Sequence, residues 1–373
     1  GPSDGSTTSD DTPPSTGNTD EPGATVTVEI KDANGATVQT LTPTVGAGGS
    51  WSVDAAQLPD GDYTLEATAI DAAGNSSPVA TSGFTVDTSA PSVAILTPAS
   101  GTSTNDDTPT VSGTAQVGST VSVTISDDQG NVLETVSPTV DVMGNWSFDA
   151  SQLADGAYTV EATATDVVNN SASTSSGFEV DTSTPIVTLD APVSGTSTND
   201  DTPTISGTTN EPGAAVTVDI TDDQGNIVET LAPMVDAMGN WSIDASQLPE
   251  GEYTASATAT DTAGNSSAPV ESTFTIDLTA PTLSITSPAM GELVETRDIE
   301  VTGQTEPGLE VTIEVIDDSG AVIDTITTTA DMNGDYSGMV TDLANGDYTL
   351  RASTTDDAGN TASEEVGVTV DSE

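Results

Sequence analysis

The sequence repeats itself every 95 residues, which limits the chain to a few copies of one small fold. Two aromatic series keep this interval, namely Trp51, Trp146, Trp241 and Tyr336, and Tyr63, Tyr158, Tyr253 and Tyr348. The motifs "DAAGN", "DVVNN", "DTAGN" and "DDAGN" begin at Asp71, Asp166, Asp261 and Asp356. Self-similarity at a fixed period is typical of tandem arrays. We therefore expect four domains, at residues 1–87, 88–181, 182–277 and 278–373.

Apolar and polar residues alternate within each repeat, as in "YTVEATATD" from Tyr158. This alternation predicts half-buried antiparallel strands separated by Gly- and Asp-rich turns. About seven such strands in one repeat suit an immunoglobulin-like sandwich. We predict an all-β protein of four tandem immunoglobulin-like β-sandwich domains in an elongated rod. The first repeat lacks the strand that opens the second one at Ser92.

The periodic aromatic residues predict the interior of each sandwich. Tyr158 and its equivalents follow a turn at the start of a long strand, where a tyrosine corner bonds its hydroxyl back to the main chain. The tryptophans are predicted to lie in the core, because so few large apolar residues are present. A sugar-stacking role for these rings is the weaker alternative.

Charge excludes several classes of partner. The 373 residues carry a formal net charge of −57, with Lys31, Arg297 and Arg351 as the sole basic side chains. Such a chain repels nucleic acid and anionic membrane surfaces. The charge also favours a soluble monomer. No apolar run is long enough for membrane insertion, and the absence of cysteine removes disulfides and thiol chemistry. The opening Gly1-Pro2-Ser3 is typical of a cloning remnant, so we expect a fragment.

Acidic residues gather at the predicted domain junctions. Each of the first three repeats ends in an aspartate that is followed, four residues later, by a proline, as in "FTVDTSAP" from Phe84. With an immunoglobulin-like strand order, this aspartate faces the loops "NEPG" and "DTAGN" of the next repeat. Carboxylates brought together in this way repel one another unless a cation lies between them. The predicted ligands are Asp181, Glu211 and Asp261, then Asp277, Glu306 and Asp356, and at the first junction Asp87 and Asp166.

Calcium suits this set best, because it accepts six to eight oxygen ligands in irregular geometry. Zinc is disfavoured, since the chain has neither histidine nor cysteine. The first junction has Gln116 and Val117 in place of the glutamate-proline pair, so weaker binding is expected there. Asn210 is a further candidate ligand, and Glu21 with Asp71 could form an incomplete site.

A second, weaker candidate lies at the opposite end of the domains. The "NDD" stretches place Asp106 and Asp107, and again Asp200 and Asp201, in one loop. These acids either hold an ion within the domain or cap the turn before the following proline. The alternative to ion binding, for any single aspartate, is that its side chain is solvated or hydrogen-bonds within its own turn.

The motifs "VDTSAP", "EPGA", "GNWS" and "DGDYT" resemble the tandem bacterial Ig-like extender repeats of large RTX adhesins, which type I secretion exports. The resemblance implies calcium ligands at the linkers, neighbouring repeats as partners, an extracellular place on the bacterial surface and a part in adhesion and biofilm formation. It implies a spacer that calcium rigidifies to project a distal binding region. The rival interpretation is a carbohydrate- or cell-binding Ig-like module of a secreted protein. An enzyme is not expected, because no common catalytic triad can form without histidine.

Overall fold

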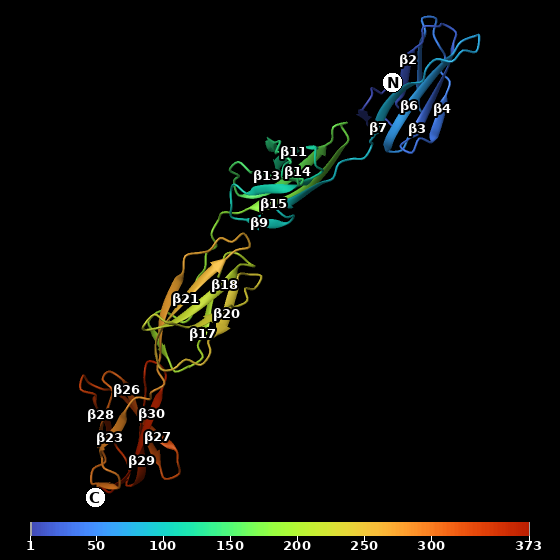
Figure 1. Ribbon diagram of the computed structural model, residues 1–373. Helices are drawn as coiled ribbons and strands as arrows, with labels where there is room; N and C mark the ends of the chain where they lie inside the picture. Colours follow the sequence, from blue (N-terminus) through green and yellow to red (C-terminus); the bar gives the residue numbers. More distant parts are fainter. Residues whose placement is uncertain (1, 373) are drawn as a thin grey trace. The chain divides into compact units, whose positions relative to one another are not determined.

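The computed structural model describes residues 2–372, and every regular element within them is a β-strand. The chain divides into two units, residues 1–183 and 184–373. Each unit holds two immunoglobulin-like sandwiches, so the predicted all-β class with four tandem domains is confirmed (Figure 1). The described residues include no helix able to cross a membrane. Gly1, with which the predicted cloning remnant begins, and Glu373 lie outside the described residues.

The described residues of the first unit, 2–183, form fifteen strands. Those of the first domain are β1 (Ser6–Thr8), β2 (Pro14–Asn18), β3 (Thr25–Asp32), β4 (Thr37–Leu41), β5 (Ser50–Asp54), β6 (Gly61–Ile70) and β7 (Ala80–Val86). Those of the second domain are β8 (Val93–Thr97), β9 (Thr102–Thr104), β10 (Thr110–Ala115), β11 (Thr120–Asp127), β12 (Val132–Val136), β13 (Asn145–Asp149), β14 (Gly156–Thr165) and β15 (Ser171–Val180).

The second unit follows the same plan. Its third domain comprises β16 (Thr196–Thr198), β17 (Thr204–Thr208), β18 (Ala215–Asp222), β19 (Ile227–Leu231), β20 (Asn240–Asp244), β21 (Gly251–Thr260) and β22 (Val270–Ile276). Its fourth comprises β23 (Leu283–Ser287), β24 (Glu292–Val294), β25 (Ile299–Thr305), β26 (Glu310–Asp317), β27 (Val322–Thr329), β28 (Asp335–Val340), β29 (Gly346–Thr355) and β30 (Thr361–Val370).

Two sheets form each sandwich. In the second domain the larger sheet has the order β12-β11-β14-β15-β9, and the smaller one has the order β13-β10-β8. The opening stretch of a domain thus serves both sheets, because β8 pairs with β10 and the short β9 then pairs in parallel with β15. This division raises the predicted seven strands to eight in the second and fourth domains.

The smaller sheet differs between the domains. The fourth domain has the three-stranded order β23-β25-β28, like the second. In the third domain the opening stretch forms only isolated bridges, Val187 with Thr209 and Ala191 with Ser206. In the first domain β2 pairs with β5 alone, and the described residues of that domain, 2–87, contain no counterpart of β8.

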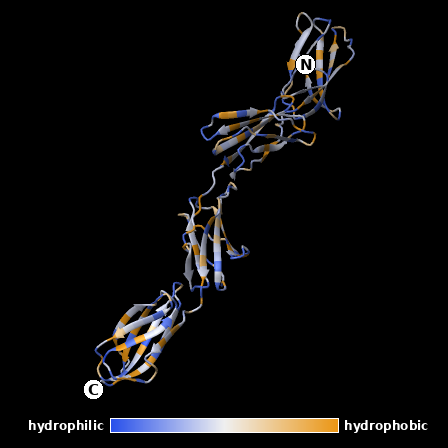
Figure 2. Cartoon of the chain, turned by 90° about the vertical axis from the view of Figure 1, so that its left-hand side faces the viewer, coloured by the Kyte–Doolittle hydropathy of each residue, from blue (hydrophilic) through white to orange (hydrophobic). Residues whose placement is uncertain are grey.

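Each domain has its own apolar core. Apolar and polar residues alternate along the strands (Figure 2), and in β11 Val121, Val123 and Ile125 are all buried. The predicted burial of the tryptophans is confirmed, since Trp146 and Trp241 are each 2% exposed. The predicted tyrosine corners are confirmed as well, because each hydroxyl donates to the carbonyl four residues earlier; the pairs are Tyr63–Pro59, Tyr158–Ala154, Tyr253–Pro249 and Tyr348–Ala344.

Candidate cation sites at the loop ends

The loops that were predicted to face the linker aspartate do lie together within a domain. In the third domain, Thr209, which directly precedes the "NEPG" loop, donates its N–H to the carbonyl of Gly239 in the turn before β20, over 2.7 Å. Glu211 of that loop and Asp261 of the "DTAGN" loop each bring a carboxylate oxygen within 4.8 Å of the other. The side chains at both positions are half-buried. Two carboxylates so placed repel one another, and a cation between them would remove that repulsion.

Asp261 is held as an anion by its own loop. Its Oδ1 accepts the N–H groups of Gly264 and Asn265, at 2.7 and 2.9 Å, and its Oδ2 accepts the amide of Asn265 at 2.8 Å. Partial burial pushes the pKa of Asp261 upward, but these hydrogen bonds outweigh it and the pKa falls below its ordinary value. The carboxylate is therefore charged at neutral pH and fixed in direction.

The same set of hydrogen bonds around the loop aspartate recurs in the second and fourth domains. There the asparagine amide also binds the preceding linker. The Asn170 amide donates to Asp166 Oδ2 at 2.9 Å and to the main-chain carbonyl of Asp87 at 2.7 Å. The Asn360 amide donates to Asp356 Oδ2 at 3.0 Å and to the carbonyl of Asp277 at 2.8 Å. One side-chain amide thus joins the linker to the loop acid of the next domain.

These asparagines were not predicted as linker contacts. They recur as the last residue of the "DAAGN" motif, at Asn75, Asn170, Asn265 and Asn360. That recurrence was a visible signal, but it indicates only a turn. The linker carbonyl as their second partner depends on how the domains meet, which sequence spacing does not reveal.

The linker aspartates use their carboxylates locally. Asp87, Asp181 and Asp277 each accept, through Oδ1, the N–H of the residue two positions on, at 3.2, 3.0 and 3.0 Å. Asp181 belongs to the first unit, and its predicted approach to Glu211 and Asp261 stays a prediction. Asp277, Glu306 and Asp356 do not bring three carboxylate oxygens within 4.8 Å of one another in the described part of the chain. Their joint ligation of an ion also stays a prediction.

The candidate ligand Asn210 and the substituted loop at the first junction both make contacts within the protein. Asn210 Oδ1 accepts the N–H of Ile186 at 2.6 Å, which fixes the start of the third domain. At the first junction, the carbonyl of Gln116 accepts the hydroxyl of Ser119 at 2.6 Å, and Val117 is 60% exposed. The loop of the second domain therefore supplies no carboxylate at the place where Glu211 supplies one.

The opposite-end acids have structural partners too. Asp106 Oδ1 accepts the N–H of Thr108 at 2.9 Å, and Asp200 accepts that of Thr202 at the same distance. Their neighbours bind glutamine amides, Asp107 that of Gln152 at 2.7 Å and Asp201 that of Gln247 at 2.6 Å. These contacts match the turn-capping alternative. Ion binding by these four aspartates stays a prediction.

The donor set is chemically suited to a hard cation. The loop ends offer carboxylates, main-chain carbonyls and amide oxygens, and the whole chain has no histidine or cysteine. Oxygen-only sets of this kind match calcium better than zinc. Glu211 and Asp261 are the residues that would hold the ion in the third domain, where it would neutralise their mutual repulsion.

Comparison with known proteins gives a family match over most of the chain. A model of the bacterial Ig-like domain matches residues 1–88, 97–182, 190–278 and 293–372. A second model, the bacterial Ig-like domain (group 3), matches residues 50–136 and 143–224. The comparison with curated proteins found no match.

Several solved structures are similar in part. The crystal structure of a tetra-tandem repeat in the extending region of a large adhesion protein shares 28% identity, covers 98% of each chain and has a TM-score of 0.36. The fibronectin(III)-like modules of Clostridium thermocellum CbhA share 19% identity over 50% of this chain and 94% of that one, with a TM-score of 0.33. CopC from Methylosinus trichosporium OB3b shares 18% identity over 24% and 94%, with a TM-score of 0.21.

Proposed function

Because the chain belongs to the bacterial Ig-like domain family and consists of four such domains in series, we propose that it is an extender segment of a bacterial surface adhesin. Calcium at the linkers stiffens the segment, which holds a distal binding region away from the cell. The term extending region also describes the tetra-tandem repeat of the large adhesion protein. The proposal includes export from the cell and the RTX type of adhesin, as the resemblance of the linker and loop motifs implies.

The contact that carries the proposal is the linker anchor. At two junctions a single asparagine amide joins the linker carbonyl, at Asp87 or Asp277, to an ionised loop carboxylate, at Asp166 or Asp356. A spacer needs linkers of this kind, because a free linker lets neighbouring domains swing and shortens the mean reach. A cation bound beside the same carboxylate would favour the anchored state over the flexed one.

The acid content supports a dependence on calcium. Glu211 and Asp261 bring like charges within 4.8 Å while half-buried, an arrangement that a divalent ion stabilises. Extracellular calcium modules bind with a Kd of roughly 10⁻⁴ to 10⁻³ M. Affinity in this range would leave the segment loose inside the cell and stiffen it outside.

The rival carbohydrate-binding function lacks a surface for sugar stacking. No aromatic side chain among residues 2–372 is exposed. Three tyrosines instead pack against phenylalanines of the same domain, as Tyr253 does with Phe274 at a ring-centroid distance of 5.7 Å. Stacking of sugars on these rings would require the core to open.

Small-angle scattering and calorimetry test the proposal together. With millimolar calcium the full chain should show a larger maximum dimension and a higher melting temperature than it does with a chelator. Titration calorimetry should show several ions bound per chain. An unchanged maximum dimension and an unchanged melting temperature after chelation would refute the calcium-stiffened spacer.

A further inference from the structure

The methionines of this chain lie on the outside of the sandwiches. Their exposed fractions run from 52% to 94%, and none of them belongs to the apolar core of a domain within residues 2–372. Methionine is among the residue types that proteins most often bury. This chain is short of large apolar residues and still places every methionine sulfur near solvent. The six are Met143, Met234, Met238, Met290, Met332 and Met339.

The turn before the tryptophan strand shows that the fold does not need a methionine side chain there. Before β13, Asp141 Oδ1 accepts the N–H of Met143 at 2.8 Å, and the carbonyl of Asp141 accepts the N–H of Gly144 at 3.0 Å. The turn before β20 repeats both bonds around Met238. The aspartate and the main chain therefore close these turns, and the methionine contributes its N–H to them.

Other repeats of the chain carry polar residues at most of the methionine positions. The same fold therefore accepts an amide, a hydroxyl or a carboxylate where these methionines stand. A methionine sulfoxide, which is polar too, should be accepted there as well. Met332 has no polar counterpart, but its side chain is 94% exposed. The polar counterparts are Asn333 for Met143 and Met238, Thr329 for Met234, Ser194 for Met290 and Asp244 for Met339.

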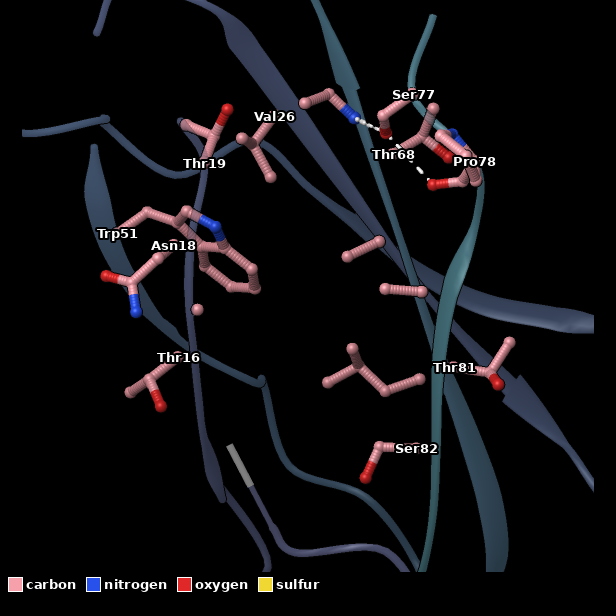
Figure 3. Close-up of a pocket in the computed structure, with 15 residues that line it drawn as sticks. Thr16, Asn18, Thr19, Val26, Trp51, Thr68, Ser77, Pro78, Thr81 and Ser82 are labelled. Atoms are coloured by element: carbon pink, nitrogen blue, oxygen red, sulfur yellow. Dashed lines mark hydrogen bonds between the residues drawn. The ribbon is translucent and has the colours of Figure 1, made fainter. Parts of the chain in front are cut away.

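The other easily oxidised side chains are absent or buried. The chain has no cysteine and no histidine, which leaves tryptophan as the next target after methionine. Trp146 and Trp241 lie in the cores of their domains. Even Trp51, which lines a cavity of the first domain (Figure 3), is only 8% exposed. Because oxidation follows exposure, an oxidant in solution should reach the methionine sulfurs before it reaches the indole rings.

We propose that the six methionines are oxidation sites at which the chain consumes hydrogen peroxide while every sandwich stays folded. At each site the thioether sulfur attacks one peroxide oxygen, the O–O bond breaks and an S=O bond forms. The sulfur loses two electrons, and the departing hydroxide takes the proton of the transferred oxygen and leaves as water. Oxidation of a buried methionine disrupts a core, whereas here the new oxygen lies in solvent. This proposal does not depend on calcium or on the spacer function.

Mass spectrometry of the full chain after peroxide treatment tests the proposal. The folded chain should gain six oxygen atoms, with none in the first domain, one in the second, two in the third and three in the fourth, as the methionine positions require. The melting temperature should fall by less than about 4 °C, because the changes lie on the surface. Uptake of fewer than six oxygens, oxidation of tryptophan before methionine, or a larger fall in melting temperature overturns the proposal.

Two variants show whether exposure selects these sites. Leu350→Met places one more thioether in the core of the fourth domain, where Leu350 is 0% exposed and the exchange is well tolerated. That sulfur should resist peroxide until urea unfolds the chain, and equal reactivity in the folded chain overturns the proposal. A sixfold variant should consume no peroxide and melt within about 4 °C of the unmodified chain. A much lower melting temperature would give the methionines a structural role and overturn the proposal too. Its changes are M143N, M234T, M238N, M290S, M332A and M339D.

Discussion

The linker that ends at the second domain and the linker that ends at the fourth share one anchor and differ in two other features. The shared anchor is the asparagine amide, at Asn170 or Asn360, which holds the linker carbonyl. The fourth domain also supplies a glutamate in its "EPG" loop, at Glu306, where the second has Gln116.

The second difference is a direct contact across the later junction. The N–H of Asn199 in the third domain donates to the carbonyl of Ala358 in the fourth at 3.0 Å. The corresponding residues at the earlier junction, Ser9 of the first domain and Val168 of the second, form no such bond within the described residues. The comparison indicates that a linker held by the asparagine amide can still allow the two domains to bend relative to each other. The asparagine fixes the chain path, whereas the acid and the loop contact determine how much the junction resists bending.

Spin labels should show the largest consequence of this difference. The chain has no cysteine, so engineered pairs can be labelled cleanly. We place one pair at Asn34→Cys and Gln129→Cys, and the matched pair at Gln224→Cys and Ser319→Cys; all four sites are exposed turn positions 95 residues apart. With calcium, the distance distribution of the later pair should be the narrower one. Removal of calcium with a chelator should broaden the distance distribution of the later pair more than that of the earlier pair. Equal widths under both conditions would contradict the proposed difference in stiffness between the two junctions.

Exchanging the loop residue should move calcium affinity from one junction to the other. Glu306→Gln removes one carboxylate from the fourth domain, and we expect roughly tenfold weaker binding at that junction, because ligand charge tunes calcium affinity. The reverse pair of changes, Gln116→Glu with Val117→Pro, should strengthen binding at the first junction. Titration calorimetry measures both. Glu300→Gln, an exposed acid on β25, is the control and should change nothing. Loss of affinity in that control would mean that overall charge, and not the loop acid, sets the binding.

Removal of the shared anchor should weaken both junctions alike. Asn170→Ala and Asn360→Ala each take an amide away from a linker carbonyl and a loop carboxylate, with a cost of about 1–3 kcal/mol where these acceptors stay out of water. Thermal unfolding in calcium-free buffer measures the loss. Asn75→Ala is the control, because its amide donates to Asp71 and to no linker in the described residues. A smaller loss at Asn360 than at Asn75 would contradict the linker role.

The sequence predicts the sandwich well and the junction only in part. The 95-residue period, the alternation of "YTVEATATD" and the turn before each Tyr are local signals, so the strands, the buried Trp146 and the tyrosine corners follow from them. The junction depends on contacts between distant segments. Spacing indicated that Glu211 and Asp261 share one end of a domain. It did not indicate that Asn210 binds Ile186, or that the last residue of "DDAGN" holds a linker carbonyl, because both depend on how a linker turns into the next sandwich.

Lowering the pH should change the melting temperature least of these tests, and it should affect the two junctions equally. Burial raises the pKa of Asp166 and of Asp356, but hydrogen bonds from Asn170 and Asn360 outweigh it, so both folded pKa values lie below the ordinary value. Groups of this kind contribute stability that is present above the unfolded pKa of about 3.9 and lost as pH falls through the folded pKa. The melting temperature without calcium should therefore stay level from pH 7 to 5 and fall below about pH 4. Asp356→Asn keeps the turn's oxygen acceptor but cannot titrate, so its decline should be shallower than that of the unmodified chain, and Asp166→Asn should match it. A steep loss between pH 7 and 5 would mean that groups other than these two carboxylates control the junctions.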